Sequence, residues 1–237
     1  MNLYEVKSWF LDYIDKYDLD NENINRKVNH SFRVMDLCEK ISISLGLSND
    51  DVKFSMVIGL LHDVGRFLQY TKWETFSDSL SVDHAELGVS ILKDNGFSDE
   101  VILKAIYNHN KYKIEDSLSE RELLISKIIR DADKLDIMYE VSCGLVYSFS
   151  NLDKLYISDE VYDEFMLMKT IDKGIIKNDL DKIVSTLAFV FDFNYECSKD
   201  IVVRDKYIDS IIGKFKYNSE TRDKFIHVKR VLDRSVK

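Results

Sequence analysis

The stretch Gly59-Leu60-Leu61-His62-Asp63-Val64-Gly65-Arg66-Phe67 ends an apolar run with a histidine and an aspartate side by side. An aspartate is rarely buried without a partner, because an unpaired charge in a low-dielectric site is costly. A bound cation would supply that partner, with the imidazole and the carboxylate as ligands. Gly65 would then let the chain turn sharply after them. The alternative is a helix end with Asp63 in water.

The composition bounds the kind of protein. The chain has 237 residues, of which 45% are hydrophobic, so it can bury a core. Its net charge of −9 argues against a general polyanion binder and predicts no nucleic-acid partner. We find no uncharged apolar run of membrane-spanning length and no signal peptide. The 3 cysteines form no Cys-x-x-Cys pair, which favours a soluble protein of the reducing cytoplasm.

The residue pattern predicts an all-α fold. The chain contains 0 prolines and 8 glycines, and no strand-like alternation persists. We predict a loop after the His-Asp pair, containing Trp73 and Phe76, and a helix start at each of Asp83, Ser98 and Ser119. The predicted helices cover about 2–17, 26–45, 49–62, 84–95, 99–110, 119–139, 156–172, 179–194, 199–213 and 219–234. A single domain over residues 1–237, with a C-terminal helical extension over about 150–237, fits this pattern.

The histidines separate on helical wheels. Of the 5 in the chain, His30, His62, His84 and His109 lie on the apolar faces of four predicted helices, whereas His227 lies opposite such a face. Each buried imidazole needs a polar partner. A shared metal site would supply one for all four histidines at once, and this constellation is the strongest functional signal in the sequence.

The predicted helix over 119–139 offers further carboxylates. Asp136 lies on its apolar face, and Asp131 and Asp133 flank that face on opposite sides. Periodicity alone leaves the choice between Asp131 and Asp133 open.

Taken in order, these residues resemble the HD-domain superfamily of metal-dependent phosphohydrolases. The matching positions are His30, the doublet His62-Asp63, and Asp133 within Ala132-Asp133-Lys134-Leu135-Asp136. Members with a two-metal site insert two further histidines between the doublet and the distal aspartate, where His84 and His109 lie. The resemblance covers residues 26–140, and the region beyond 150 receives no support from it.

The resemblance implies an HD-domain helical bundle with additional C-terminal helices. It implies that His30, His62, Asp63 and Asp133 would hold one metal. Asp63 would bridge to a second metal, completed by His84 and His109. Imidazole and carboxylate ligands suit two divalent transition metal ions, such as Fe, Mn, Zn, Co or Ni, better than magnesium or calcium. Two such ions can clamp a phosphate and lower the pKa of a bridging water.

Two cations near these motifs are candidates for binding a phosphate. Arg66 lies just past the doublet, and Lys134 follows Asp133. The planar fork of an arginine suits phosphate oxygens. The alternative for Arg66 is a solvated helix-end cation. With Asp63, these two residues form the predicted catalytic set.

The predicted function is a metal-dependent phosphohydrolase acting on a nucleotide or another small phosphate ester or anhydride. The absence of proline disfavours the cyclic-dinucleotide branch, and no Glu-Asp pair of the alarmone-hydrolase branch follows the doublet. One alternative is an HD-fold diiron oxygenase that cleaves a C–C or C–P bond, with Tyr70 or Tyr107 lining its site. Another is a non-catalytic nucleotide-binding HD module. A homo-oligomer is compatible with each reading.

Overall fold

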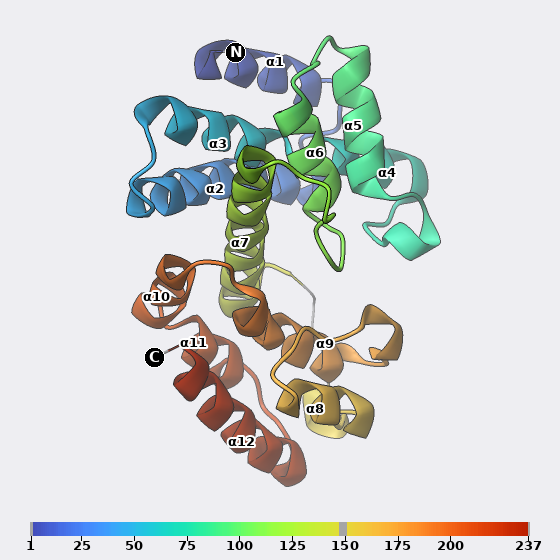
Figure 1. The fold of residues 1–237 in the computed structure, drawn as a ribbon. Coiled ribbons are helices and arrows are strands. Elements are labelled where there is room, and N and C mark those ends of the chain that lie inside the picture. The colour runs from blue at the N-terminus through green and yellow to red at the C-terminus, as the bar shows by residue number, and fades with distance from the viewer. Residues whose placement is uncertain (1, 147–150, 237) are drawn as a thin grey trace. The chain divides into compact units, whose positions relative to one another are not determined.

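The computed structural model describes residues 2–146 and 151–236, which form helices and connecting loops without a strand (Figure 1). The predicted all-α fold is confirmed. The chain divides into two compact units, residues 1–133 and 134–237. The assignment of a single domain stays a prediction. Within the described ranges, no helix combines the length and the apolar character needed to cross a membrane.

The first unit carries six complete helices and the beginning of a seventh. They are α1 (Leu3–Ile14), α2 (Glu22–Ser44), α3 (Asn49–Leu61), α4 (Val64–Trp73), α5 (His84–Asp94), α6 (Glu100–Asn108) and α7 (Glu120–Cys143), with a short 3₁₀ turn, η1 (Asp78–Leu80), before α5. Helix α7 continues into the second unit from Lys134 onwards. The hydrophobic core of this unit lies between α2, α3 and the helices that pack on them.

Helices α2 and α3 approach each other closely at Gly59. A Cβ on Gly59 would lie 2.9 Å from Met35 Cα and 2.9 Å from Cys38 Sγ, both on α2. Real Cβ atoms do not come this near to backbone atoms, so the contact requires a glycine. The close approach brings the buried stripe of α2, which includes His30, against the end of α3 that leads into His62.

Helices α4 and α5 make a similar contact at Gly65. A Cβ there would lie 2.1 Å from the carbonyl oxygen of His84 and 2.8 Å from the backbone nitrogen of Gly88. Gly65 lies inside α4 and is not among the glycines with a positive φ. It therefore serves close helix packing, and the expectation that it makes a sharp turn is wrong.

The predicted loop after the His-Asp pair is also wrong in its first half, because residues 64–73 form α4. Three features hide this helix from pattern analysis. The residue before the helix, Asp63, makes no capping hydrogen bond with its side chain. The helix is followed by Glu74, which has φ +51° although it is not a glycine. In addition, Gln69 is completely buried, so polar residues lie on the inward face.

Two of the predicted helix starts are confirmed and one is shifted. The Asp83 side chain accepts hydrogen bonds from the backbone of Ala85 and Glu86. Ser119 and Glu122 form a reciprocal pair, in which each side chain accepts from the other backbone N–H. For α6, the capping side chain belongs to Asp99 and not to Ser98.

After the end of α7, the described part of the second unit carries five further helices. They are α8 (Asp159–Met166), α9 (Asp179–Leu187), α10 (Glu196–Arg204), α11 (Tyr207–Gly213) and α12 (Ser219–Ser235), with 3₁₀ turns η2 (Leu152–Lys154), η3 (Lys173–Ile175) and η4 (Ala188–Asp192). The single helix predicted over 199–213 is two helices, because the chain breaks at Lys206, whose φ is +54°. His227 on α12 is exposed, as predicted.

Candidate metal centre

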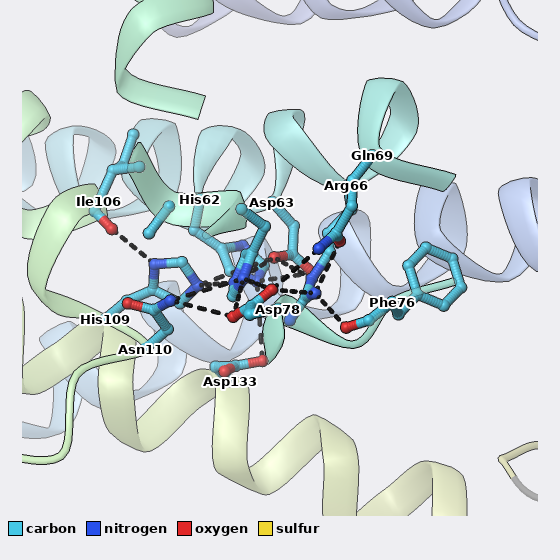
Figure 2. A network of polar contacts seen from close by, with 12 residues as sticks. His62, Asp63, Arg66, Gln69, Phe76, Asp78, Ile106, His109, Asn110 and Asp133 are labelled. Carbon is cyan, nitrogen blue, oxygen red and sulfur yellow. Dashed lines mark hydrogen bonds and ion pairs between the residues drawn. The ribbon is translucent and has the colours of Figure 1, made fainter. Parts of the chain in front are cut away.

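The six predicted ligand residues converge in the first unit. They come from α2 (His30), the α3–α4 junction (His62, Asp63), the first residue of α5 (His84), the residue after α6 (His109) and α7 (Asp133). The four imidazoles and Asp63 are buried, and the Asp133 side chain is 19% exposed. Figure 2 shows His62, Asp63, His109 and Asp133 turned toward one another.

Asp63 lies at the middle of this cluster, with one carboxylate oxygen toward each pair of histidines. Its Oδ2 atom is 3.4 Å from His30 Nε2 and 3.6 Å from His62 Nε2. Its Oδ1 atom is 3.4 Å from His84 Nε2 and 3.7 Å from His109 Nε2. One carboxylate therefore links two separate groups of nitrogen atoms.

Asp133 joins the first of these groups. Its Oδ1 atom lies 3.2 Å from His30 Nε2 and 3.6 Å from His62 Nε2. Periodicity left the choice between Asp131 and Asp133 open. The structure brings Asp133 to the histidines. We call His30, His62, Asp133 and Asp63 Oδ2 the first half-site, and His84, His109 and Asp63 Oδ1 the second half-site.

The far nitrogen of three imidazoles is held by a hydrogen-bond acceptor. His62 Nδ1 lies 2.8 Å from the Gly59 carbonyl oxygen, and His109 Nδ1 lies 2.6 Å from that of Ile106. His84 Nδ1 lies 2.8 Å from Asp78 Oδ2. These acceptors assign the proton of each neutral ring to Nδ1. The Nε2 lone pairs therefore point inward.

The charge state of the cluster follows from burial and from its neighbours. Burial lowers the pKa of His62, and burial with the adjacent Arg66 cation lowers the pKa of His84 to about 3. For Asp63, burial acts in the opposite direction, but the Lys27 ammonium and the surrounding imidazoles hold the pKa well below its usual range. The neighbouring His30 and His62 lower the pKa of Asp133 in the same way, also against the effect of burial. At neutral pH His62 and His84 are therefore neutral, and the carboxylates of Asp63 and Asp133 are ionised.

These donors fit a metal ion. His30 Nε2 is 3.1 Å from His62 Nε2, and His84 Nε2 is 3.0 Å from His109 Nε2. In each half-site, lone pairs on neutral nitrogens and carboxylate oxygens face one another, and a cation between them would satisfy all of them. Mixed imidazole and carboxylate ligands suit borderline transition metals.

Two cations flank Asp63, one on each oxygen. Lys27 Nζ is 2.7 Å from Oδ2, and Arg66 Nε is 3.6 Å from Oδ1. Sequence analysis missed Lys27, which is buried one turn before His30 on the inward stripe of α2. A lysine on the inward side of a predicted helix could have indicated a nearby carboxylate, because lysine is seldom buried without an anionic partner.

One nitrogen of the Arg66 guanidinium is hydrogen-bonded within the protein. Its Nη1 atom donates to Gln69 Oε1, to the Phe76 carbonyl oxygen and to Asp78 Oδ1, over 2.6 to 2.9 Å. Its Nε atom is buried without a hydrogen-bond partner among the described residues. A buried donor of this kind is costly unless a ligand or water meets it.

The other side chains that sequence analysis considered for the site have different surroundings. Lys134 forms an ion pair with Asp192. Phe76 stacks on Tyr70 with the ring centroids 4.8 Å apart, and Trp73 at the end of α4 is 40% exposed. The Lys111 ammonium lies 4.4 Å from the centroid of the Tyr107 ring.

Arg130 ties the segment that carries His109 to helix α7. Its Nη1 atom donates to the carbonyl oxygens of Asn108 and His109, at 3.2 and 3.5 Å, and also to that of Lys111. Arg130 is buried and lies one turn before Asp133. It therefore fixes the spacing between two predicted ligands, a role that no sequence pattern indicated.

Comparison with known families agrees with this geometry. The family model for the HD domain matches residues 28–138. This match confirms the resemblance to the HD-domain superfamily that was inferred from the sequence. HD domains are generally metal-dependent phosphohydrolases that bind divalent metals. Searches of curated proteins and of solved structures gave no match to the chain.

Proposed function

We propose that this protein is a two-metal phosphohydrolase acting on a nucleotide or another small phosphate ester or anhydride. The observation that carries the proposal is the position of Asp63, whose two carboxylate oxygens each face a separate pair of histidines. His30, His62, Asp63 and Asp133 would hold one divalent metal ion. Asp63, His84 and His109 would hold the other. The match to the HD domain supports the reaction class.

The bound ions would supply Lewis-acid polarisation of the phosphoryl group and lower the pKa of the attacking water. The protein contributes ligand orientation through the acceptors at Nδ1 of His62, His84 and His109. Burial of the imidazoles excludes water from all but the substrate side.

Lys27 and Arg66 would orient the phosphate and balance its charge. They approach opposite oxygens of Asp63, so each half-site has a cation of its own. The unpartnered Arg66 Nε is suited to donate to a phosphoryl oxygen, while Nη1 keeps the side chain fixed. We predicted Lys134 for this role as well, and its ion pair with Asp192 disfavours it.

The proposal is tested by metal content and turnover together. The chain would be purified without chelator, its metal counted by elemental analysis, and the metal-free protein reloaded with Mn²⁺, Co²⁺ or Fe²⁺. We expect close to two ions per chain and metal-dependent phosphate release from a panel of nucleotides and small phosphate esters.

The same assay distinguishes the alternatives. Substrate-dependent O₂ uptake by the iron-loaded protein, without phosphate release, would favour the diiron oxygenase. Tight nucleotide binding without turnover under any metal would favour the non-catalytic module. Failure to bind metal in any preparation would refute the proposal.

A further inference from the structure

The imidazole of His84 is supported differently from those of His62 and His109. His62 and His109 each place Nδ1 against a carbonyl oxygen three residues earlier in the chain, so their orientation is fixed locally. His84 Nδ1 lies 2.9 Å from Asp78 Oδ1 and 2.8 Å from Asp78 Oδ2. Asp78 belongs to the segment of residues 74–83 between α4 and α5.

Asp78 is itself fixed by two residues of α4. Its Oδ1 atom accepts from Arg66 Nη1 and from Gln69 Nε2, both at 2.9 Å. Gln69 Nε2 also lies 2.9 Å from Ser81 Oγ and from the Val82 carbonyl oxygen, and Gln69 is completely buried. The segment 74–83 is thus attached to one turn of α4 by a connected set of polar contacts that ends on His84. Figure 2 shows Arg66, Gln69 and Asp78 in this arrangement.

We propose that Asp78 is a positioning residue for His84 and that, through it, metal binding at the second half-site is coupled to attachment of the segment 74–83. The inference rests on the proposed two-metal centre. An anionic partner at Nδ1 fixes the tautomer and orientation of a ligating imidazole and increases its basicity toward the metal. Asp78 contacts the centre at His84, in the second half-site, so we expect the metal affinity of that half-site to depend on Asp78 most strongly.

The coupling is reciprocal. If the attached segment strengthens metal binding, the bound metal must favour the attached segment by the same factor. Leu80 in this segment is exposed, and few of the segment's side chains are buried. Local opening of the segment therefore costs little free energy when no metal is bound. Filling the second half-site should therefore slow amide exchange in residues 74–83.

The test is a Mn²⁺ titration of metal-free full-length protein, comparing the natural chain with Asp78→Asn. This substitution retains the size of the side chain and removes its charge. We expect the second Mn²⁺ to bind about 10–100-fold more weakly in the variant, with the first unchanged. Hydrogen exchange should show that the second ion protects residues 74–83 in the natural chain and not in the variant.

Asp99→Asn is the matched control. Asp99 caps α6 in the same unit and is remote from Nδ1 of His84, and asparagine caps helices as well as aspartate. It should leave both affinities unchanged. Thermal melts of the metal-free proteins complete the comparison, since a merely structural role of Asp78 would lower stability and weaken both ions together.

The outcomes separate this inference from the proposed function. Equal retention of both ions in Asp78→Asn, or equal weakening of both, would overturn the coupling. One ion per natural chain would overturn it too, while leaving a single-metal centre. A natural chain that binds no Mn²⁺ would instead refute the proposed function itself.

Discussion

The two half-sites of the centre are held in place by different kinds of contact. The first half-site depends on the contact of α2 with α3 at Gly59, and on the hydrogen bond from His62 to the Gly59 carbonyl oxygen three residues earlier. The second depends on the contact of α4 with α5 at Gly65, and on side-chain contacts to the segment 74–83. Helix backbone is stiff, whereas a loop attached by side chains opens more readily. The comparison predicts a more permanent first half-site and a second half-site that responds to its surroundings.

Asp63→Ala should produce the largest effect, because Asp63 is the only side chain shared by the two half-sites as we define them. We expect loss of both metal ions and of measurable phosphate release. Elemental analysis and a phosphate-release assay on the same preparation check this. Circular dichroism must show a helical content equal to that of the natural chain, and a variant that keeps both ions would refute the bridging role.

Glycine substitutions should affect the half-sites one at a time. Gly59→Ala places a Cβ 2.9 Å from Met35 Cα, and Gly65→Ala places one 2.1 Å from the His84 carbonyl oxygen. Both atoms belong to the backbone and cannot move aside, so each variant should lose about 1–3 kcal/mol of unfolding free energy, with Gly65→Ala at the upper end. Urea unfolding and Mn²⁺ titration should show weakening of the first half-site by Gly59→Ala and of the second by Gly65→Ala.

Gly88→Ala is the control on the α4–α5 contact. Its Cβ would lie 3.4 Å from the nearest atom, the backbone nitrogen of Gly65, which is an ordinary contact distance. We expect near-natural stability and metal binding. Helix propensity favours alanine over glycine in both variants, so an equal loss of stability in Gly88→Ala and Gly65→Ala would mean that the close approach at Gly65 does not determine the effect.

The pH dependence of the unfolding free energy should reflect the protonation of the buried imidazoles. Burial lowers the pKa of His62, and that of His84 falls to about 3, whereas an unfolded histidine titrates near 6.5. Below about pH 6.5 the unfolded chain binds protons that the folded chain does not, so stability falls as the pH decreases toward 3. His84 contributes about 1.4 kcal/mol per pH unit within this window, and His62 acts in the same direction.

Urea unfolding of the metal-free protein between pH 7 and pH 5 measures this slope. His84→Gln should reduce this slope by the contribution of about one proton. An unchanged slope in His84→Gln would mean that His84 is charged in the folded protein. It would also contradict the assignment of an inward lone pair on its Nε2 atom.

Sequence reasoning identified the inward histidines because helical periodicity alone determines which side of a helix is buried. His30, His62, His84 and His109 are all at most 5% exposed, as their positions on the wheels predicted. The order of these residues along the chain then pointed to the HD superfamily. Both inferences use local spacing, which the sequence records directly.

The sequence was less informative where contacts between distant residues determine the structure. Helix α4 was missed because Gln69 is polar, faces inward and finds its hydrogen-bond partners in Arg66 and in the segment 74–83. Asp133 could not be separated from Asp131, because both flank the apolar face of one helix and only the packing of α7 selects between them. Lys27 was overlooked, since its partner Asp63 is 36 residues away in the chain.

The smallest effect is expected for Lys134, which sequence reasoning grouped with the catalytic residues. Its ammonium is paired with Asp192, whereas the ammonium of Lys27 lies 2.7 Å from Asp63 in the first half-site. Lys134→Met should therefore change kcat/KM by less than about threefold, while Lys27→Met should reduce it about 10²-fold, as removal of a group that stabilises developing charge does. Both variants remove one positive charge and retain an unbranched side chain, so steady-state kinetics on one substrate compares them directly. A loss for Lys134→Met as large as that for Lys27→Met would show that the Asp192 pair opens during turnover, and would assign the first half-site two phosphate-binding cations and the second only Arg66.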